Sequence, residues 1–181
     1  MSARDRGIET HYGLARHCPT MSRIRVVTGV GTGPTEIASY DAALAAANVH
    51  NYNLVTVSSV IPADATVEAV GSAPDLGPAG NRLTVVEARA TVPTGDPAGA
   101  VLGWATGPGP GLFYEAAGPE TPETLRAEVE RGLSAGRELR DWTFTDESVA
   151  VESVAPGELG PGADEWTTVV ALAVYGDSEA I

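Results

Sequence analysis

The most informative stretch of the chain is Asn53-Leu54-Val55-Thr56-Val57-Ser58-Ser59-Val60-Ile61-Pro62. Its apolar and β-branched residues predict a strand over residues 54–61 that ends at Pro62, because proline cannot donate a backbone hydrogen bond. Two adjacent serines, Ser58 and Ser59, lie where this strand meets the proline, a place that suits local backbone strain. The Ser58–Ser59 peptide bond is therefore the candidate reactive element.

The composition contains no lysine, and all 11 basic residues are arginine. A chain without lysine cannot hold pyridoxal phosphate as an internal Schiff base, nor use a lysine amine as a nucleophile. A carbonyl for chemistry on amines would therefore have to come from the backbone. Transfer of the Ser58 acyl group to the Ser59 hydroxyl, followed by elimination of the ester, would turn Ser59 into a pyruvoyl group.

The formal net charge of −13 excludes some partners. A chain this acidic cannot neutralise a row of phosphates, so we expect no binding to nucleic acid or to anionic membrane surfaces. It does permit a cationic substrate, because a negative field concentrates cations near a cleft. The same charge is typical of proteins from salt-rich cytoplasm, where salt screens self-repulsion, so it says little about the substrate.

The N-terminal segment differs from the rest of the chain. Residues 1–20 show no clear periodicity, and we expect a disordered extension followed by a single domain over residues 21–181. Three potential ligands, His11, His17 and Cys18, lie in this segment without the spacing of a metal motif, so we expect no metal. One cysteine allows no intrachain disulfide, and neither a signal peptide nor a membrane span is apparent, which favours the cytoplasm.

Apolar patterning predicts about seven strands and two helices. The strands are expected at residues 23–30, 54–61, 83–92, 101–104, 112–114, 148–154 and 166–175. The helices are expected at residues 36–47 and 122–140, the second with an apolar stripe of Leu125, Val129 and Leu133. Strands and helices do not alternate, so the pattern favours an α+β fold over a doubly wound parallel sheet.

Two other motifs do not carry the chemistry. Gly29-Val30-Gly31-Thr32-Gly33-Pro34 has proline at the position of the third glycine of a dinucleotide loop, and a Walker loop needs a lysine, so we interpret this segment as a turn. All three histidines precede residue 51, which gives little support to a histidine base. Acid–base work would therefore fall to carboxylates or tyrosine.

The chain resembles the pyruvoyl-dependent arginine decarboxylases over roughly residues 23–176. Four blocks in the family's order and spacing carry the resemblance: Tyr40-Asp41-Ala42-Ala43-Leu44, the segment 53–62, Tyr114-Glu115, and Leu139-Arg140-Asp141-Trp142. The resemblance implies a proenzyme that cuts itself into a β chain of residues 1–58 and an α chain of residues 59–181. It also implies a four-layer αββα sandwich, assembled as homotrimers with active sites between neighbouring subunits.

The resemblance further implies a role for each matching residue. Ser58 would supply the acyl carbonyl and Ser59 the attacking hydroxyl and later the pyruvoyl cofactor, while Asn53 would position the bond and help its oxyanion. Glu115, or its neighbour Tyr114, would return a proton during decarboxylation of L-arginine, bound as a Schiff base, to agmatine and CO₂, a step of polyamine biosynthesis. Asp41 would face the substrate guanidinium, whose fork matches a carboxylate.

Two alternatives stay open at this stage. A pyruvoyl-dependent decarboxylase could act on another basic amino acid, such as histidine, because Asp41 alone does not separate arginine from a smaller cation. A subunit of the same fold could also remain uncleaved and serve only assembly, since fold does not fix function.

Overall fold

The computed structural model describes residues 22–159 and 165–181. The expectations for residues 1–20, including the group of His11, His17 and Cys18, lie outside these ranges. Within them the chain forms nine strands and two helices. The expectation of an α+β fold is confirmed.

The strands are divided between two sheets. The five-stranded sheet has the order β2-β5-β9-β1-β4 and consists of β1 (Arg23–Gly33), β2 (Asn53–Thr56), β4 (Thr66–Gly71), β5 (Arg82–Pro93) and β9 (Trp166–Tyr175). The four-stranded sheet has the order β3-β7-β6-β8 and consists of β3 (Val60–Ile61), β6 (Ala98–Thr106), β7 (Gly111–Gly118) and β8 (Asp146–Val154). The second sheet is antiparallel throughout, whereas β1 runs parallel to β4 and β2 parallel to β5.

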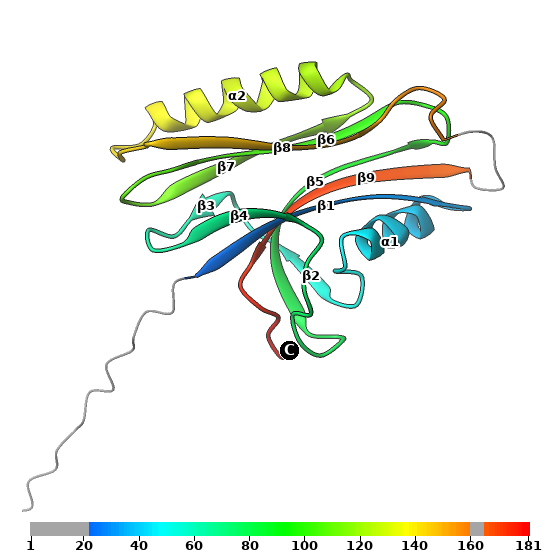
Figure 1. Cartoon of the computed structure of the whole chain (residues 1–181), viewed down its shortest axis with the longest axis horizontal. Coiled ribbons are helices and arrows are strands. Elements are labelled where there is room, and N and C mark those ends of the chain that lie inside the picture. Colours follow the sequence, from blue (N-terminus) through cyan, green and yellow to red (C-terminus); the bar gives the residue numbers. More distant parts are fainter. Residues whose placement is uncertain (1–21, 160–164) are drawn as a thin grey trace, which may run out of the picture.

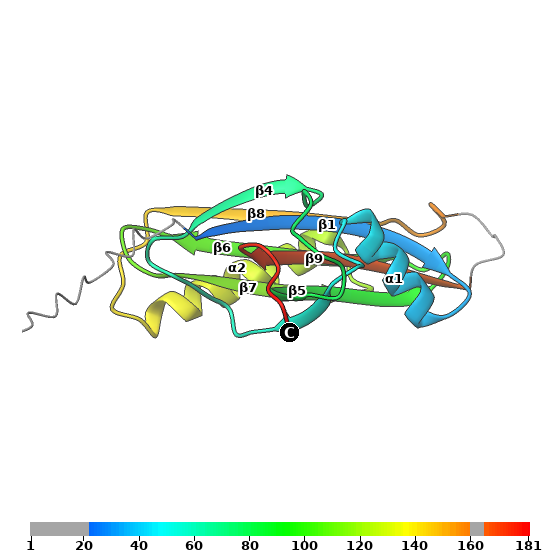
Figure 2. The ribbon, with the colours of Figure 1, turned by 90° about the horizontal axis from the view of Figure 1, so that it is seen from below.

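The two sheets lie face to face, with one helix on each outer side (Figure 1). Helix α1 (Glu36–Ala46) packs mainly on β1 and β9, and α2 (Pro122–Glu138) packs on β6 and β7. The largest apolar cluster fills the space between the sheets and includes Val26, Leu102, Phe113 and Val169. Figure 2, turned by 90°, shows the strands of both sheets running along the length of the molecule.

The glycine-rich segment belongs to a strand, so the expectation of a turn over residues 29–34 was wrong. Gly29, Gly31 and Gly33 alternate along β1 and therefore share the face that α1 covers. A Cβ on Gly29 would lie 2.2 Å from the Ala43 carbonyl oxygen, and one on Gly31 would lie 2.2 Å from the Ala43 nitrogen. Glycine is present here because the helix backbone rests directly on the strand.

Helix α2 confirms the predicted amphipathic stripe. Thr121 caps its first turn by accepting a hydrogen bond from the Thr124 amide, and a proline occupies the first turn, where its missing N–H costs nothing. Leu125, Val129 and Leu133 are all buried against the four-stranded sheet. Each such side chain contributes roughly 1.5–3 kcal/mol by leaving water.

The strand expected at residues 54–61 is two strands that belong to different sheets. β2 is an edge strand of the five-stranded sheet, β3 is an edge strand of the four-stranded sheet, and residues 57–59 connect them. An apolar run looks the same whether its strand stays in one sheet or changes sheets, so the pattern could not show the break. This division, together with the unexpected strand β4, accounts for nine strands instead of seven.

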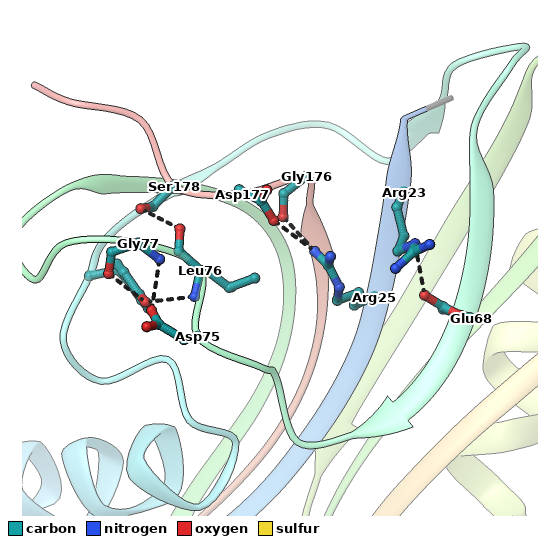
Figure 3. A network of polar contacts seen from close by, with 10 residues as sticks. Arg23, Arg25, Glu68, Asp75, Leu76, Gly77, Gly176, Asp177 and Ser178 are labelled. Carbon is teal, nitrogen blue, oxygen red and sulfur yellow. Dashed lines mark hydrogen bonds and ion pairs between the residues drawn. The ribbon is translucent and has the colours of Figure 1, made fainter. Parts of the chain in front are cut away.

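Side chains at the start of β1 bind neighbouring segments (Figure 3). Arg23 forms an ion pair with Glu68 of β4 at 3.2 Å. Arg25 donates to the Gly176 carbonyl at 2.9 Å and to Asp177 at 3.2 Å in the C-terminal tail. Strand β1 is therefore tied on both sides to segments that follow residue 59 in the sequence.

Candidate active site

The Ser58–Ser59 bond lies where the chain leaves one sheet and enters the other. The Val57 amide still donates to the Val85 carbonyl of β5 at 2.9 Å, and this is the last backbone bond to the first sheet. The Ser59 carbonyl already accepts from the Phe113 amide of β7 at 2.8 Å. Backbone hydrogen bonds therefore hold both sides of the Ser58–Ser59 bond, one to each sheet.

The Ser58 carbonyl itself accepts a hydrogen bond from the Val60 amide at 2.9 Å, in a tight turn centred on Ser59. A backbone N–H aimed at a carbonyl oxygen stabilises negative charge that develops there during nucleophilic attack. The local fold thus supplies a donor for an oxyanion on Ser58, independently of any side chain.

Glu115 contacts the Ser59 hydroxyl. The Ser59 Oγ donates to Glu115 Oε2 at 3.1 Å, a distance at which a carboxylate can accept the hydroxyl proton. Glu115 is exposed on β7, two residues after Phe113, the residue that binds the Ser59 carbonyl. The pairing of β3 with β7 therefore brings together two residues that are 56 positions apart in the sequence.

A cavity of about 490 Å³ surrounds this pair, and its lining comprises Ser58, Ser59, Val60, Phe113, Tyr114, Glu115 and Arg140. Three of the predicted site residues, Ser58, Ser59 and Glu115, therefore share one cavity. Their chemical roles stay predictions.

Helix α2 supports one wall of this cavity through glycine. The Tyr114 ring packs against Gly132 and Gly136, where an added Cβ would lie 2.4 Å and 2.5 Å from ring carbons. These two glycines, four residues apart, form a shallow groove on one face of the helix. The Tyr114 ring is thereby fixed on the α2 side of β7, on the face opposite to Phe113.

Tyr175 is a site residue that sequence reasoning missed. Its hydroxyl donates to the Val60 carbonyl at 2.9 Å, and its ring meets Phe113 edge to face with centroids 6.2 Å apart. Burial, and then the negative charge of Glu115, raise the pKa of Tyr175 to about 12, so the hydroxyl stays protonated and keeps donating near neutral pH. Only its position at the end of the last apolar strand could have drawn attention to it.

Asp41 and Asn53 lie elsewhere in this chain. Both line a second pocket, of about 580 Å³, together with Tyr40, His50 and Tyr52, among other residues. The Asn53 Nδ2 donates to the Gly80 carbonyl at 2.6 Å, which fixes the start of β2. Neither residue lines the Ser59 cavity, so within one chain the structure does not bring them to the reactive bond.

The residue before Asp41 anchors this part of α1. The Tyr40 hydroxyl donates to Glu87 Oε1 at 2.6 Å, and the Arg89 guanidinium lies 4.4 Å from the centre of the Tyr40 ring. Burial and then the hydrogen bond to Glu87 raise the pKa of Tyr40 well above its usual value. The turn of α1 that carries Asp41 is therefore tied to β5.

Across residues 22–159 and 165–181, no group of three histidine, cysteine or acidic side chains is arranged to hold a metal ion. In the same part of the chain no helix has the length and apolar character needed to cross a membrane.

A sequence model described as "Pyruvoyl-dependent arginine decarboxylase (PvlArgDC)" matches residues 23–180. The chain belongs to the pyruvoyl-dependent arginine decarboxylase family. The predicted resemblance is thereby confirmed. The family's name identifies the cofactor as a pyruvoyl group, which stands in the place of pyridoxal phosphate.

Curated relatives of this family agree. A pyruvoyl-dependent arginine decarboxylase of Halobacterium salinarum is 54% identical over 162 residues, which cover 89% of this chain and 98% of that protein. Namesakes from Methanopyrus kandleri and Thermococcus sibiricus are 28% and 30% identical and cover 83% and 67% of this chain, and 93% and 78% of their own lengths. The Halobacterium relative is consistent with the acidic, lysine-free composition.

The residues of the first cavity fit the family's cofactor. A pyruvoyl group made from Ser59 needs an acyl carbonyl before it and a hydroxyl that can reach that carbonyl. The Ser58 carbonyl and the Ser59 hydroxyl lie in one turn that hydrogen bonds hold to both sheets. The Ser59 hydroxyl also donates a hydrogen bond to the Glu115 carboxylate.

Proposed function

We propose that this chain cuts itself between Ser58 and Ser59 and then acts as a lyase that converts L-arginine to agmatine and CO₂. One observation carries the proposal: the Ser59 hydroxyl donates to Glu115 beside a Ser58 carbonyl that already accepts the Val60 amide. Membership of the arginine decarboxylase family supports the choice of substrate.

The self-cleavage follows from these contacts. Glu115 takes the Ser59 hydroxyl proton, the freed oxygen attacks the Ser58 carbonyl carbon, and the Val60 amide stabilises the oxyanion. The C–N bond breaks to give an ester and a free Ser59 amine. Loss of the Ser59 α-proton then expels Ser58 as a carboxylate and leaves a dehydroalanine, from which water displaces ammonia to give the keto group.

In the mature enzyme the pyruvoyl group supplies a ketone that receives the substrate amine and draws electrons away from the substrate carboxylate. The same chain provides the groups that hold the residue-59 end of this ketone. The Phe113 amide keeps the carbonyl oxygen of residue 59 in place, and Tyr175 holds the next carbonyl. Glu115 holds the proton that returns to the substrate Cα.

We propose that a neighbouring copy of the chain completes the site. Asp41 and Asn53 line a different pocket from Ser59, so a guanidinium held by Asp41 needs a second subunit to bring it to the keto group. Three apolar side chains, Ile37 on α1, Val55 on β2 and Val57 just after β2, are exposed, as expected for a surface covered by another copy. A trimer of the kind implied by the family is the proposed assembly.

The finer description of fold and location is proposed on the same basis. The order helix, sheet, sheet, helix fits the four-layer αββα sandwich of these decarboxylases, with residues 21–181 as one domain cut at residue 58. A cytoplasmic location is proposed from the single cysteine and the salt-adapted composition.

The test is the mass of freshly folded protein, kept in concentrated KCl and then denatured. We expect two pieces separated after Ser58, with a ketone on the larger one that reacts with hydrazine. Ser59→Ala, which removes the attacking hydroxyl, should stay whole and inactive. A wild-type chain that stays whole would leave only a structural role.

A substrate panel decides between amino acids. CO₂ release should be fastest from arginine when arginine, ornithine, lysine and histidine are compared at equal concentrations. A cleaved enzyme that is inert toward arginine but active on another of these would transfer the proposal to that amino acid.

A further inference from the structure

Arg140 lines the Ser59 cavity, and the mechanism above gives it no role. It follows the end of α2, where its Nη1 donates to the Gly136 carbonyl at 2.7 Å. Its guanidinium carbon lies 5.2 Å from the centre of the Trp142 ring. The half-buried side chain is thus held from two sides, and it lines the same cavity as Ser58 and Ser59.

The guanidinium of Arg140 has no carboxylate partner among the described residues. The ion pairs found there involve five other arginines: Arg23, Arg25, Arg82, Arg126 and Arg137. Two other described arginines, Arg89 and Arg131, also lack a carboxylate partner, but both are exposed to water, whereas Arg140 is half-buried. A partly desolvated guanidinium gains most when it binds a carboxylate through its planar fork.

Self-cleavage creates such a carboxylate in the same cavity. Expulsion of Ser58 from the ester leaves its α-carboxylate as a new chain terminus, next to Glu115 and therefore exposed to like-charge repulsion. We propose that Arg140 binds the carboxylate formed at Ser58 and so acts as a positioning residue for the elimination step. This inference rests on the self-cleavage proposed above.

The substrate carboxylate is the competing partner, and catalysis disfavours it. A guanidinium paired with the group that leaves as CO₂ would stabilise the ground state more than the transition state, and the reaction would slow. The Ser58 carboxylate, by contrast, persists after cleavage. An ion pair with it lowers the energy of the cleaved state and of the charge that develops as the ester breaks.

The experiment follows cleavage of Arg140→Gln by intact mass. Loss of a charge-assisted contact to the leaving carboxylate should slow cleavage about 10- to 100-fold. The uncut protein should accumulate as an ester, which hydroxylamine converts to fragments ending at Ser58. Arg140→Lys keeps the charge and should recover part of the rate.

The matched control is Arg137→Gln. Arg137 lies one turn earlier near the same helix end but pairs with Glu147 at 2.7 Å and does not line the cavity, so its loss changes the net charge equally and should leave cleavage unchanged. Cleavage of Arg140→Gln at the wild-type rate would overturn the proposal. A normal rate combined with a raised KM for arginine would assign Arg140 to the substrate instead.

A measurement on the wild-type enzyme covers the case in which Arg140→Gln does not fold. With ¹³C in the serine carbonyl carbons, the Ser58 terminus of the cleaved protein gives a signal that follows its protonation. An unpaired terminal carboxyl, with a pKa of about 3.3–3.7, begins to shift as the pH falls from 7 to 4. A paired one should not shift, so movement over this interval would overturn the inference. If wild-type protein never cleaves, the proposed function itself fails, which is a separate result.

Discussion

The Ser59 cavity and the Asp41 pocket differ in what one chain can build. In the first, pairing of β3 with β7 brings the Ser59 hydroxyl to 3.1 Å from Glu115, so the proposed cleavage site and its proposed base meet within one chain. In the second, Asp41 and Asn53 lie on α1 and at the start of β2, and neither reaches the serines. Under the proposed mechanism, one chain suffices for self-cleavage, whereas binding of the substrate guanidinium would need a second copy.

Glu115→Gln should disturb the first region most. The amide cannot take the Ser59 proton or return one to the substrate, so we expect cleavage to slow and kcat of the cleaved fraction to fall about 10²- to 10⁴-fold. KM for arginine should change little, because recognition is assigned to Asp41. Intact mass and steady-state kinetics give the two readouts; a change in KM alone would contradict the division.

Asp41→Ala should spare cleavage and weaken recognition. Loss of a charge-assisted contact to the guanidinium should reduce kcat/KM about 10- to 100-fold, while the mass spectrum still shows two pieces. Coexpression with Ser59→Ala sharpens the comparison. If each site takes Ser59 from one chain and Asp41 from its neighbour, roughly a quarter of the sites in randomly mixed oligomers contain both wild-type residues and are fully active. If both residues act within one chain, no site contains both.

Two glycine substitutions should separate the regions through packing. A methyl group on Gly132 meets the Tyr114 ring at 2.4 Å, and one on Gly31 meets the Ala43 nitrogen at 2.2 Å. Each should lower the free energy of unfolding by about 1–3 kcal/mol. Gly132→Ala should also slow self-cleavage, whereas Gly31→Ala should displace α1 and raise KM; the reverse pattern would show that the two regions are coupled.

Tyr175→Phe should have the smallest effect, below about 1 kcal/mol near neutral pH, because it removes one hydrogen bond to Val60. The sign of its pH dependence is clear. Since the folded-state pKa of Tyr175 is about 12 and the usual value is 10.0, the unfolded chain loses this proton first.

Stability from Tyr175 is therefore complete below pH 10 and lost between pH 10 and 12. Denaturant unfolding of Ser59→Ala with and without Tyr175→Phe, at pH 9 and pH 11, isolates this contribution from the other tyrosines. The stability advantage of the tyrosine should shrink at the higher pH.

Periodic patterns in the sequence predicted the parts of the fold that depend on residues close to one another along the chain. The stripe on α2 and the long strands β5 and β9 follow from periodicity and were found where expected. The change of sheet at residues 57–59 could not be predicted, because it depends on partners in β5 and β7 that are distant in sequence. The glycines of β1 led to the wrong prediction of a turn for a related reason. They are needed because α1 packs directly on the strand, and a glycine-rich turn has the same composition.

The residues of the candidate site likewise fall into those that the sequence identified and one that it did not. Ser58 and Ser59 were identified from their position before Pro62 and the absence of lysine, while Glu115 and Asp41 came from the family's blocks. Tyr175 went unnoticed because its link to Val60 is made 115 residues away. Residue type alone does not reveal a contact made across the sheets.

The position of β1 inside the five-stranded sheet would keep the two pieces of a cleaved chain together. After the proposed break at residue 58, the short piece would contribute β1 to the interior of a sheet, with β9 and β4 of the long piece on either side. Arg23 and Arg25 would bridge to Glu68 of β4 and to Asp177 after β9. The two pieces would then form a non-covalent complex that separates only if the pairings of β1 with β4, β1 with β9 and β2 with β5 are all broken. Once heat has separated the two pieces, refolding requires a bimolecular association, because no peptide bond joins them any longer. Thermal inactivation of the cleaved protein should therefore be irreversible.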